Sequence, residues 1–257
     1  MSTVPYLTLT SDGGTVYNFS GSFWIIDNEW TKTSSIKNIA YAHGGRNVAD
    51  NFLQARTITI EGLLYADSIA LLETAERLLV KAILRGGKLT VSDDTVSRYI
   101  DVRYGSKSGT YILEGNRYAK PYTITFIAEY PFWQDSTETT DTQVLAGNGT
   151  FTVDNSGSDE IVLPIIEIIA DQAADLPGIR IKNKTDGNMV FEYIDASFLA
   201  GAALIIDSSL GTVKLNNNDA MEYVTIANFL RLQPEINTFA YEGNACTINV
   251  KFRKVYL

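Results

Sequence analysis

The chain has 257 residues, 45% of them apolar, with a single cysteine and a formal net charge of -9. Its length is about twice that of a typical domain, so two hydrophobic cores can form, while one cysteine excludes a disulfide framework within the chain. The sequence has a pI near 4.7 and lacks a basic block, a membrane-length apolar run and a signal-peptide pattern, so we expect a soluble protein from a reducing compartment, without stable nucleic-acid binding and without membrane association.

The N-terminal part of the chain is predicted to be rich in strands. Residues 6–10 and 15–19 flank a Ser-Asp-Gly-Gly turn and predict a hairpin. Other runs of β-branched and aromatic residues predict further strands at 22–30, 36–42, 52–65, 88–91, 98–104, 110–113 and 118–128.

One helix is predicted among these strands, over residues 67–85. Asp67 is a favourable N-cap, and Gly86 and Gly87 follow the expected end. Apolar side chains at spacings of three and four predict one buried stripe, formed by Leu71, Ala75, Leu78, Leu79, Ala82 and Ile83. A single helix among strands predicts an α+β domain, a β-barrel or sandwich covered on one side.

A change of composition follows this domain. Residues 1–133 carry 13 Lys/Arg and 13 Asp/Glu, whereas residues 134–257 carry 8 and 17, so the whole net charge lies in the second half. The change coincides with a Thr-rich stretch at residues 135–142. We therefore predict a first domain at 1–134, a linker at 135–148 and a second domain at 149–257.

The second domain is predicted to be an all-β sandwich. Short apolar runs recur between turns at residues 149–153, 161–170, 178–181, 189–194, 203–207, 212–215, 225–232, 238–241 and 245–254. The last run alternates, with Cys246, Ile248, Val250 and Phe252 predicted on the inner face. Cys246 is thus expected to be a buried, unreactive thiol.

The sequence offers little catalytic chemistry. His43 is the only histidine, and the Gly105–Gly109 stretch has Lys107 where a nucleophile elbow needs serine. The oxygen-rich segments 154–159 and 216–219 do not follow the EF-hand ligand order and are interpreted as turns. No pair of carboxylates stands out for glycoside hydrolysis. We predict no catalytic residues, no metal site and no cofactor.

Several short motifs occur in a characteristic order. They are residues 56–64, 86–89, 98–102 and 126–133 in the first half, then 153–157, 164–168, 181–185, 204–207, 229–237 and 250–257. In this order, over nearly the whole chain, the sequence resembles the distal tail proteins of long-tailed bacteriophages. The resemblance implies a mainly β chain, with an N-terminal split β-barrel carrying one helix and a C-terminal galectin-like β-sandwich. One turn departs from the family, because Pro234-Glu235-Ile236-Asn237 replaces the frequent Pro-Gly-x-Asn.

The resemblance also implies a structural role in the virion. A homo-hexameric ring at the tail tip, made in the host bacterial cytoplasm, would join the tail tube protein to the fibre, receptor-binding or tail-associated lysin hub. The neutral first half suits close packing against copies of itself, and the acidic second half suits a peripheral position.

Ring contacts are expected in the irregular, aromatic-rich stretch between residues 24 and 52. Candidate interface residues are Trp30, His43, Arg46 and Phe52, together with Trp24. The alternative assigns these aromatic residues to the core and the intervening stretch to a solvated loop.

Other functions remain open at this point. A galectin-like sandwich suggests a carbohydrate-binding module that contacts the host surface, with Tyr193, Tyr223 and Tyr241 as stacking platforms in a domain that has no tryptophan. A hydrolase would depend on His43. The same structural role also fits a gene transfer agent or a phage-tail-like bacteriocin.

Overall fold

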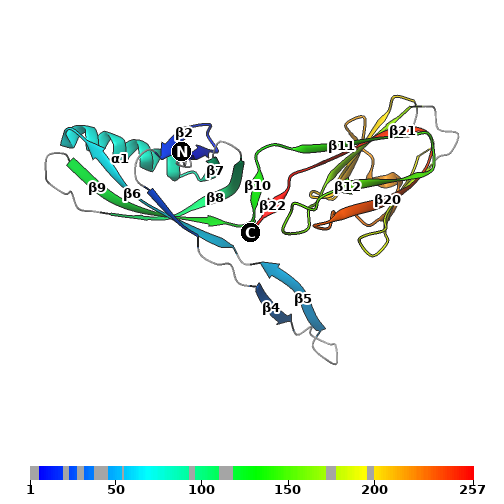
Figure 1. Ribbon diagram of the computed structural model, residues 1–257, viewed down its shortest axis with the longest axis horizontal. Coiled ribbons are helices and arrows are strands. Elements are labelled where there is room, and N and C mark those ends of the chain that lie inside the picture. The colour runs from blue at the N-terminus through cyan, green and yellow to red at the C-terminus, as the bar shows by residue number, and fades with distance from the viewer. Residues whose placement is uncertain are drawn as a thin grey trace. The chain divides into compact units, whose positions relative to one another are not determined.

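The computed structural model describes residues 6–19, 23–27, 32–37, 46–53, 55–92, 96–109, 118–171, 178–195 and 200–257 (Figure 1). The chain divides into two compact units, residues 1–133 and 134–257. Each unit is built mainly from antiparallel strands, which confirms the mainly β prediction.

The first unit contains one open antiparallel sheet with the strand order β2-β1-β7-β8-β9-β6-β3. Its strands are β1 (Tyr6–Ser11), β2 (Val16–Phe19), β3 (Phe23–Asp27), β6 (Arg56–Ala66), β7 (Gly87–Ser92), β8 (Ser97–Ser108) and β9 (Tyr118–Ala128). The hairpin predicted at the N-terminus is β1–β2. Between Tyr104 and Ser106 the register of β8 against β9 shifts, and such a bulge bends a strand and increases its twist.

A second, two-stranded ladder belongs to the same unit. It pairs β4 (Lys32–Lys37) with β5 (Arg46–Leu53) and forms a sheet of its own (Figure 1). The sequence predicts one of these strands at 36–42 instead. The strand predicted at residues 110–113 lies outside the described residues.

Helix α1 (Ile69–Ile83) packs on one face of the open sheet. Its N-cap is Ser68, whose Oγ accepts a hydrogen bond from the Leu71 backbone N–H at 3.3 Å, and not Asp67 as predicted. The helix ends before Gly86, which has φ +66°; a Cβ there would lie 2.3 Å from the Val102 carbonyl oxygen. Glycine is therefore required both for the conformation and for the close approach of β8.

The buried face of α1 is rotated from the predicted stripe. Leu72, Leu79, Ala82 and Ile83 are buried, whereas Leu71 and Leu78 are 57% and 58% exposed. The prediction was wrong for these two leucines because the apolar positions of the helix cover more than one face, and only contact with the sheet selects among them. The core that α1 completes includes Leu7, Leu9, Phe19, Ile58, Ile60, Leu89, Ile100, Ile124 and Phe126.

The second unit contains two sheets, as the predicted sandwich requires. The six-stranded sheet has the order β11-β21-β13-β16-β17-β18 and the five-stranded sheet the order β12-β20-β14-β15-β19. The first consists of β11 (Thr139–Leu145), β13 (Ile165–Ala170), β16 (Ala203–Asp207), β17 (Thr212–Leu215), β18 (Asn218–Asp219) and β21 (Cys246–Phe252). The second consists of β12 (Gly149–Asp154), β14 (Gly178–Asn183), β15 (Met189–Ile194), β19 (Val224–Ala227) and β20 (Ile236–Glu242). Three short elements remain: β10 (Trp133–Asp135), which begins at the last residue of the first unit, the 3-10 turn η1 (Met221–Tyr223), and β22 (Val255–Tyr256), which pairs with β10.

Alternating burial defines the interior between these two sheets. In β21 the side chains of Cys246, Ile248, Val250 and Phe252 are buried and the residues between them are not, as predicted. The five-stranded sheet contributes Phe151 of β12 and Phe239 of β20 to this interior, and their rings stack with 5.1 Å between centroids. Apolar side chains at every second position thus hold the sheets together.

The predicted linker at residues 135–148 is corrected by the structure. Thr139–Leu145 form β11, which pairs antiparallel with β21 along its whole length. Threonine has a high strand propensity, so this composition is as typical of an edge strand as of a linker.

Candidate assembly interface

The residues predicted at a ring interface are only partly within the described structure. Trp30 and His43 lie outside the described residues. Arg46 and Phe52 both lie on β5, where they pair with Lys37 and Thr33 of β4, respectively. The structure thus places two of the four candidates on one strand, and their interface role stays a prediction.

The open sheet of the first unit offers two edges for assembly. Within the described residues, β2 and β3 end the strand path, and each pairs on one side only. Edge strands present backbone N–H and C=O groups that can pair with another chain. On β2 the side chain of Val16 is 58% exposed.

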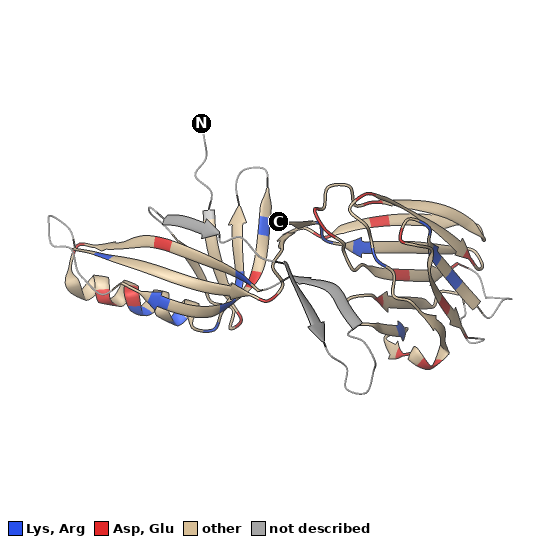
Figure 2. Cartoon of the chain, turned by 90° about the horizontal axis from the view of Figure 1, so that it is seen from below, with Lys and Arg blue, Asp and Glu red and all other residues tan. Residues whose placement is uncertain are grey.

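Helix α1 adds an exposed apolar surface to the first unit. Leu71 and Leu78 stand seven residues apart on one side of the helix, with the half-buried Ala75 between them. Acidic residues (red) and basic residues (blue) recur along α1 (Figure 2). Neither leucine contributes to the core, so both are available to a neighbouring molecule.

An ion-pair cluster fixes the inner side of α1 to the sheet. The carboxylate of Glu76 accepts hydrogen bonds from Lys107 Nζ of β8 at 2.6 Å and from Lys120 Nζ of β9 at 2.5 Å. These hydrogen bonds, first from Lys107 and then from Lys120, hold the pKa of Glu76 below its ordinary value of 4.5. The cluster was not predicted, because its members come from three elements far apart in sequence.

Buried amide side chains anchor a loop of the second unit. Asn237 is fully buried; its Nδ2 donates to the carbonyl oxygens of Gln233 at 2.9 Å and Glu235 at 2.8 Å. Its Oδ1 accepts from the Gln233 backbone N–H at 2.9 Å and from Asn183 Nδ2 at 3.3 Å. Asn237, the asparagine of the Pro234-Glu235-Ile236-Asn237 motif, therefore stabilises the turn in which it lies through its own side-chain hydrogen bonds.

Asn155 has a similar role in the motif at residues 153–157. It is fully buried, and its Nδ2 donates to the Gln233 carbonyl oxygen at 3.1 Å. Its Oδ1 accepts from Ser158 Oγ at 2.6 Å, and Ser158 Oγ in turn accepts from the Val255 backbone N–H at 3.2 Å. The oxygen-rich segment at 154–159 thus serves the structure of this turn.

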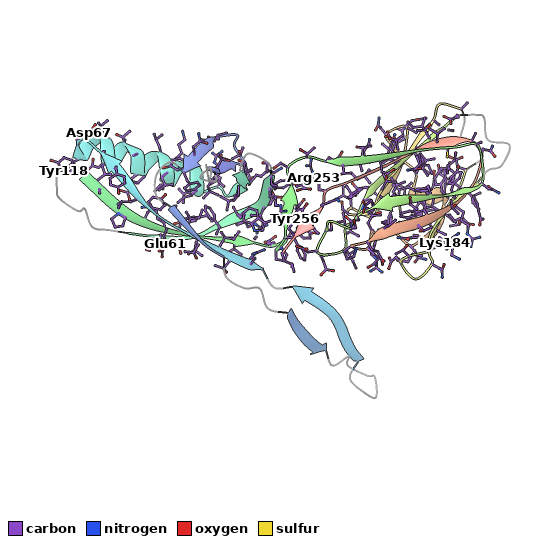
Figure 3. The ribbon with its side chains drawn as sticks, in the orientation of Figure 1. Glu61, Asp67, Tyr118, Lys184, Arg253 and Tyr256 are labelled. Carbon is purple, nitrogen blue, oxygen red and sulfur yellow. The ribbon has the colours of Figure 1, made fainter. Side chains whose placement is uncertain are left out.

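The start of the second unit is held by its C-terminal residues, Arg253 and Tyr256, which are labelled in Figure 3. Arg253 Nη1 donates to the carbonyl oxygens of Asp135 at 3.0 Å and Ser136 at 2.5 Å. Tyr256 donates its hydroxyl to Asp135 Oδ2 at 3.0 Å. These bonds involve the same segment that the sequence suggested to be a linker.

Two of the three proposed sugar platforms are not accessible. Tyr193 is 1% and Tyr241 is 2% exposed, so neither ring can stack on a ligand, and that assignment was wrong. Tyr223 is 39% exposed and packs edge-on against Tyr193. The two buried rings occupy inward positions of β15 and β20, which the sequence pattern alone did not distinguish.

A groove of about 400 Å³ lies on the five-stranded sheet of the second unit. Arg180 of β14 stands opposite Glu192 of β15 and Glu242 of β20, and Asn148 and Ile194 also line the groove. Arg180 Nη1 lies 3.5 Å from Glu242 Oε2, and Glu192 Oε2 accepts from Thr225 Oγ1 at 2.6 Å. Sequence analysis missed this site, because sheet pairing brings its members together from three strands.

The described residues offer no other conspicuous chemistry. Within them, no group of three or more His, Cys, Asp or Glu side chains is arranged to hold a metal ion. Cys246 is buried, and burial raises the pKa of its thiol, which fits the predicted unreactive role. No helix in the described part of the chain is long and apolar enough to cross a membrane.

Comparisons with known proteins support the resemblance stated from the sequence. A sequence model of the family described as siphovirus-type tail component, C-terminal domain, matches residues 157–256. A search of curated proteins finds no significant match.

Solved structures provide the fold comparison. The crystal structure of the Dit protein of phage SPP1, described as a paradigm of the hub adsorption apparatus in phages infecting Gram-positive bacteria, is similar with a TM-score of 0.72 and 16% identity, over 98% of this chain and 99% of that chain. A chain of the phage P2 baseplate in its activated conformation with calcium gives a TM-score of 0.48 and 11% identity, over 98% of both chains. Together, the family match and the fold likeness to the SPP1 protein confirm the predicted resemblance to siphophage distal tail proteins.

Proposed function

We propose that the chain is a structural subunit of a siphophage tail tip, a distal tail protein that serves as the hub of the baseplate. The match of residues 157–256 to a siphovirus-type tail component supports a structural tail protein. The fold shared with the SPP1 hub protein over nearly the whole chain supports the same role for both units together.

The hub is proposed to be a homo-hexameric ring built by the first unit. The observation that carries this proposal is the open antiparallel sheet, which ends at β2 on one side and at β3 on the other among the described strands. Two different edges on one subunit suit a heterologous, head-to-tail contact, and such contacts close into rings when the rotation allows. The zero net charge of residues 1–133 removes long-range repulsion between copies.

The ring is proposed to sit between the tail tube protein and the fibre, receptor-binding or lysin hub, at the tip of the virion tail. The acidic second unit then belongs on the periphery, where its charge is solvated. The same physical arrangement serves a phage, a gene transfer agent or a phage-tail-like bacteriocin, and neighbouring genes would distinguish these.

Solution mass tests the ring directly. Light scattering coupled to size exclusion should report six times the 28.3 kDa chain mass, and negative-stain electron microscopy should show rings. A strictly monomeric chain at high protein concentration, without rings, would contradict the proposal.

A matched pair of variants tests which edge assembles. Val16→Lys places a charge on the exposed edge strand β2 of the first unit, and Val144→Lys makes the same change on the edge strand β11 of the second, where Val144 is 74% exposed. A lysine on an edge strand opposes pairing with another chain. Val16→Lys should reduce the hexamer fraction, whereas Val144→Lys should leave it unchanged. The opposite result would assign assembly to the second unit.

A further inference from the structure

We infer that the groove on the five-stranded sheet of the second unit binds a neutral, polyhydroxylated ligand, a saccharide, through Arg180 and its two flanking glutamates. The inference is independent of the ring proposal, because every residue in it belongs to the second unit. It also replaces the aromatic platforms suggested by the sequence, two of which are buried.

The hydrogen-bonding capacity of Arg180 is largely unused. A guanidinium has five N–H donors. The one ion pair of Arg180, to Glu242, is long at 3.5 Å, and its Nε has no hydrogen-bond partner among the described residues although that atom is buried. The side chain as a whole is 43% exposed and lines the groove. Because Nε is buried, a ligand would use the Nη groups of this guanidinium as hydrogen-bond donors.

The two glutamates next to Arg180 determine which net charge a ligand can carry in this groove. Glu192 and Glu242 stand directly across from it on the two neighbouring strands, which gives the three-residue row a net charge of -1. An anionic ligand would meet two carboxylates, and a cationic ligand would leave the guanidinium without an acceptor. A ligand whose groups both donate and accept, without net charge, satisfies all three side chains. Hydroxyl groups on a sugar ring have this property.

The groove also has the shape and the apolar contact that a sugar ring needs. Its volume of about 400 Å³ is within the range of small-molecule sites, which combine apolar walls with a few oriented polar groups. Ile194, 43% exposed, supplies an apolar wall for the C–H face of a ring. Asn148 already uses its Oδ1 to accept the Gly243 backbone N–H at 2.8 Å, so the amide is oriented with its NH₂ group as a donor for a ligand.

Binding can be measured on the purified full-length chain with neutral methyl glycosides. The probes are the methyl glycosides of galactose, glucose, N-acetylglucosamine and rhamnose, titrated at millimolar concentration and followed by amide chemical shifts. At least one should shift resonances of residues 178–180, 192–194 and 242–243. Glucuronate and oligolysine are the charged comparison probes and should bind more weakly.

Arg180→Met should weaken the binding of the responsive glycoside at least about tenfold, because it removes the guanidinium and keeps an apolar stem. Lys182→Met is the matched control: it removes a cation from the next outward position of β14, outside the groove. The control should bind the glycoside with the same affinity as the unmodified chain. Both variants should have the melting temperature and the solution mass of the unmodified chain.

Three results would overturn the inference. These are no response to any of the four glycosides, equal loss in both variants, or a preference for oligolysine, which would identify a basic protein segment as the occupant. Loss of the hexamer in every sample would contradict the ring proposal and leave this inference unaffected.

Discussion

At the scale of single residues, two asparagines in the motifs that suggested a family act through buried hydrogen bonds. Asn155 and Asn237 are both fully buried, and their amides form hydrogen bonds with backbone groups of turns. Pro234-Glu235-Ile236-Asn237 departs from the frequent family sequence, yet the asparagine that closes the turn is present. A buried amide with several partners is costly to lose, because several hydrogen bonds are lost at once.

Asn237→Ala should lower the free energy of unfolding of the second unit by roughly 3 kcal/mol, because the fully buried amide loses its hydrogen bonds to Gln233, Glu235 and Asn183 at once. Chemical denaturation followed by tyrosine fluorescence can measure this. Asn218→Ala, at an exposed position of β18, is the control and should change stability much less. Equal effects would show that the amide network adds little stability.

The Glu76 cluster gives the first unit a defined dependence on pH. Because hydrogen bonds from Lys107 and Lys120 depress the pKa of Glu76 in the folded state, the unfolded chain takes up the proton more readily. The stabilisation is therefore complete above the ordinary pKa of 4.5 and is lost as pH falls through the lower folded value.

Glu76→Gln should lower the stability of the first unit at neutral pH by roughly 1 kcal/mol. In acid the variant and the unmodified chain should converge. Thermal melting across this pH range measures the difference. Glu73→Gln, on the exposed side of the same helix, should show no such pattern, and a pH-independent difference for Glu76→Gln would refute the assignment.

At the scale of elements, the segment at residues 139–145 differs most from its prediction. As β11 it covers one edge of β21, so its backbone is paired and its position is fixed. Such a segment should resist proteolysis, in contrast to the exposed linker that the threonine content suggested.

A fragment of residues 134–257 should therefore be folded and monomeric, whereas residues 146–257 should be less stable by on the order of 3 kcal/mol or more, because the hydrogen bonds of β11 are lost. The shorter fragment should also self-associate, since the edge of β21 becomes open. Sizing and denaturation of both fragments check this. Equal stability and equal mass would restore the linker interpretation.

At the scale of the whole molecule, the uneven charge separates the proposed duties of the two units. Residues 1–133 are neutral and residues 134–257 carry all nine excess negative charges. Repulsion between acidic units is strongest at low ionic strength and is screened by salt. We therefore expect self-assembly to depend on the first unit.

Expressed separately, residues 1–133 should form rings and residues 134–257 should remain monomeric at both low and high salt. Light scattering of the two fragments measures this. A monomeric first fragment, or a second fragment that oligomerises in low salt, would show that the ring contact has been assigned to the wrong unit.

The sequence by itself determined many of the local elements and the family resemblance. Residues 118–128, 189–194, 203–207 and 212–215 were predicted as strands with the bounds that the structure shows, because alternating and β-branched patterns are local properties. Tertiary structure alone decided which leucines of α1 are buried and that a Thr-rich stretch is an edge strand. It also decided which tyrosines are hidden and which charged residues meet around Glu76 and Arg180. These features depend on contacts between strands and helices far apart in the chain, and periodicity in one segment carries no information about its neighbours in space.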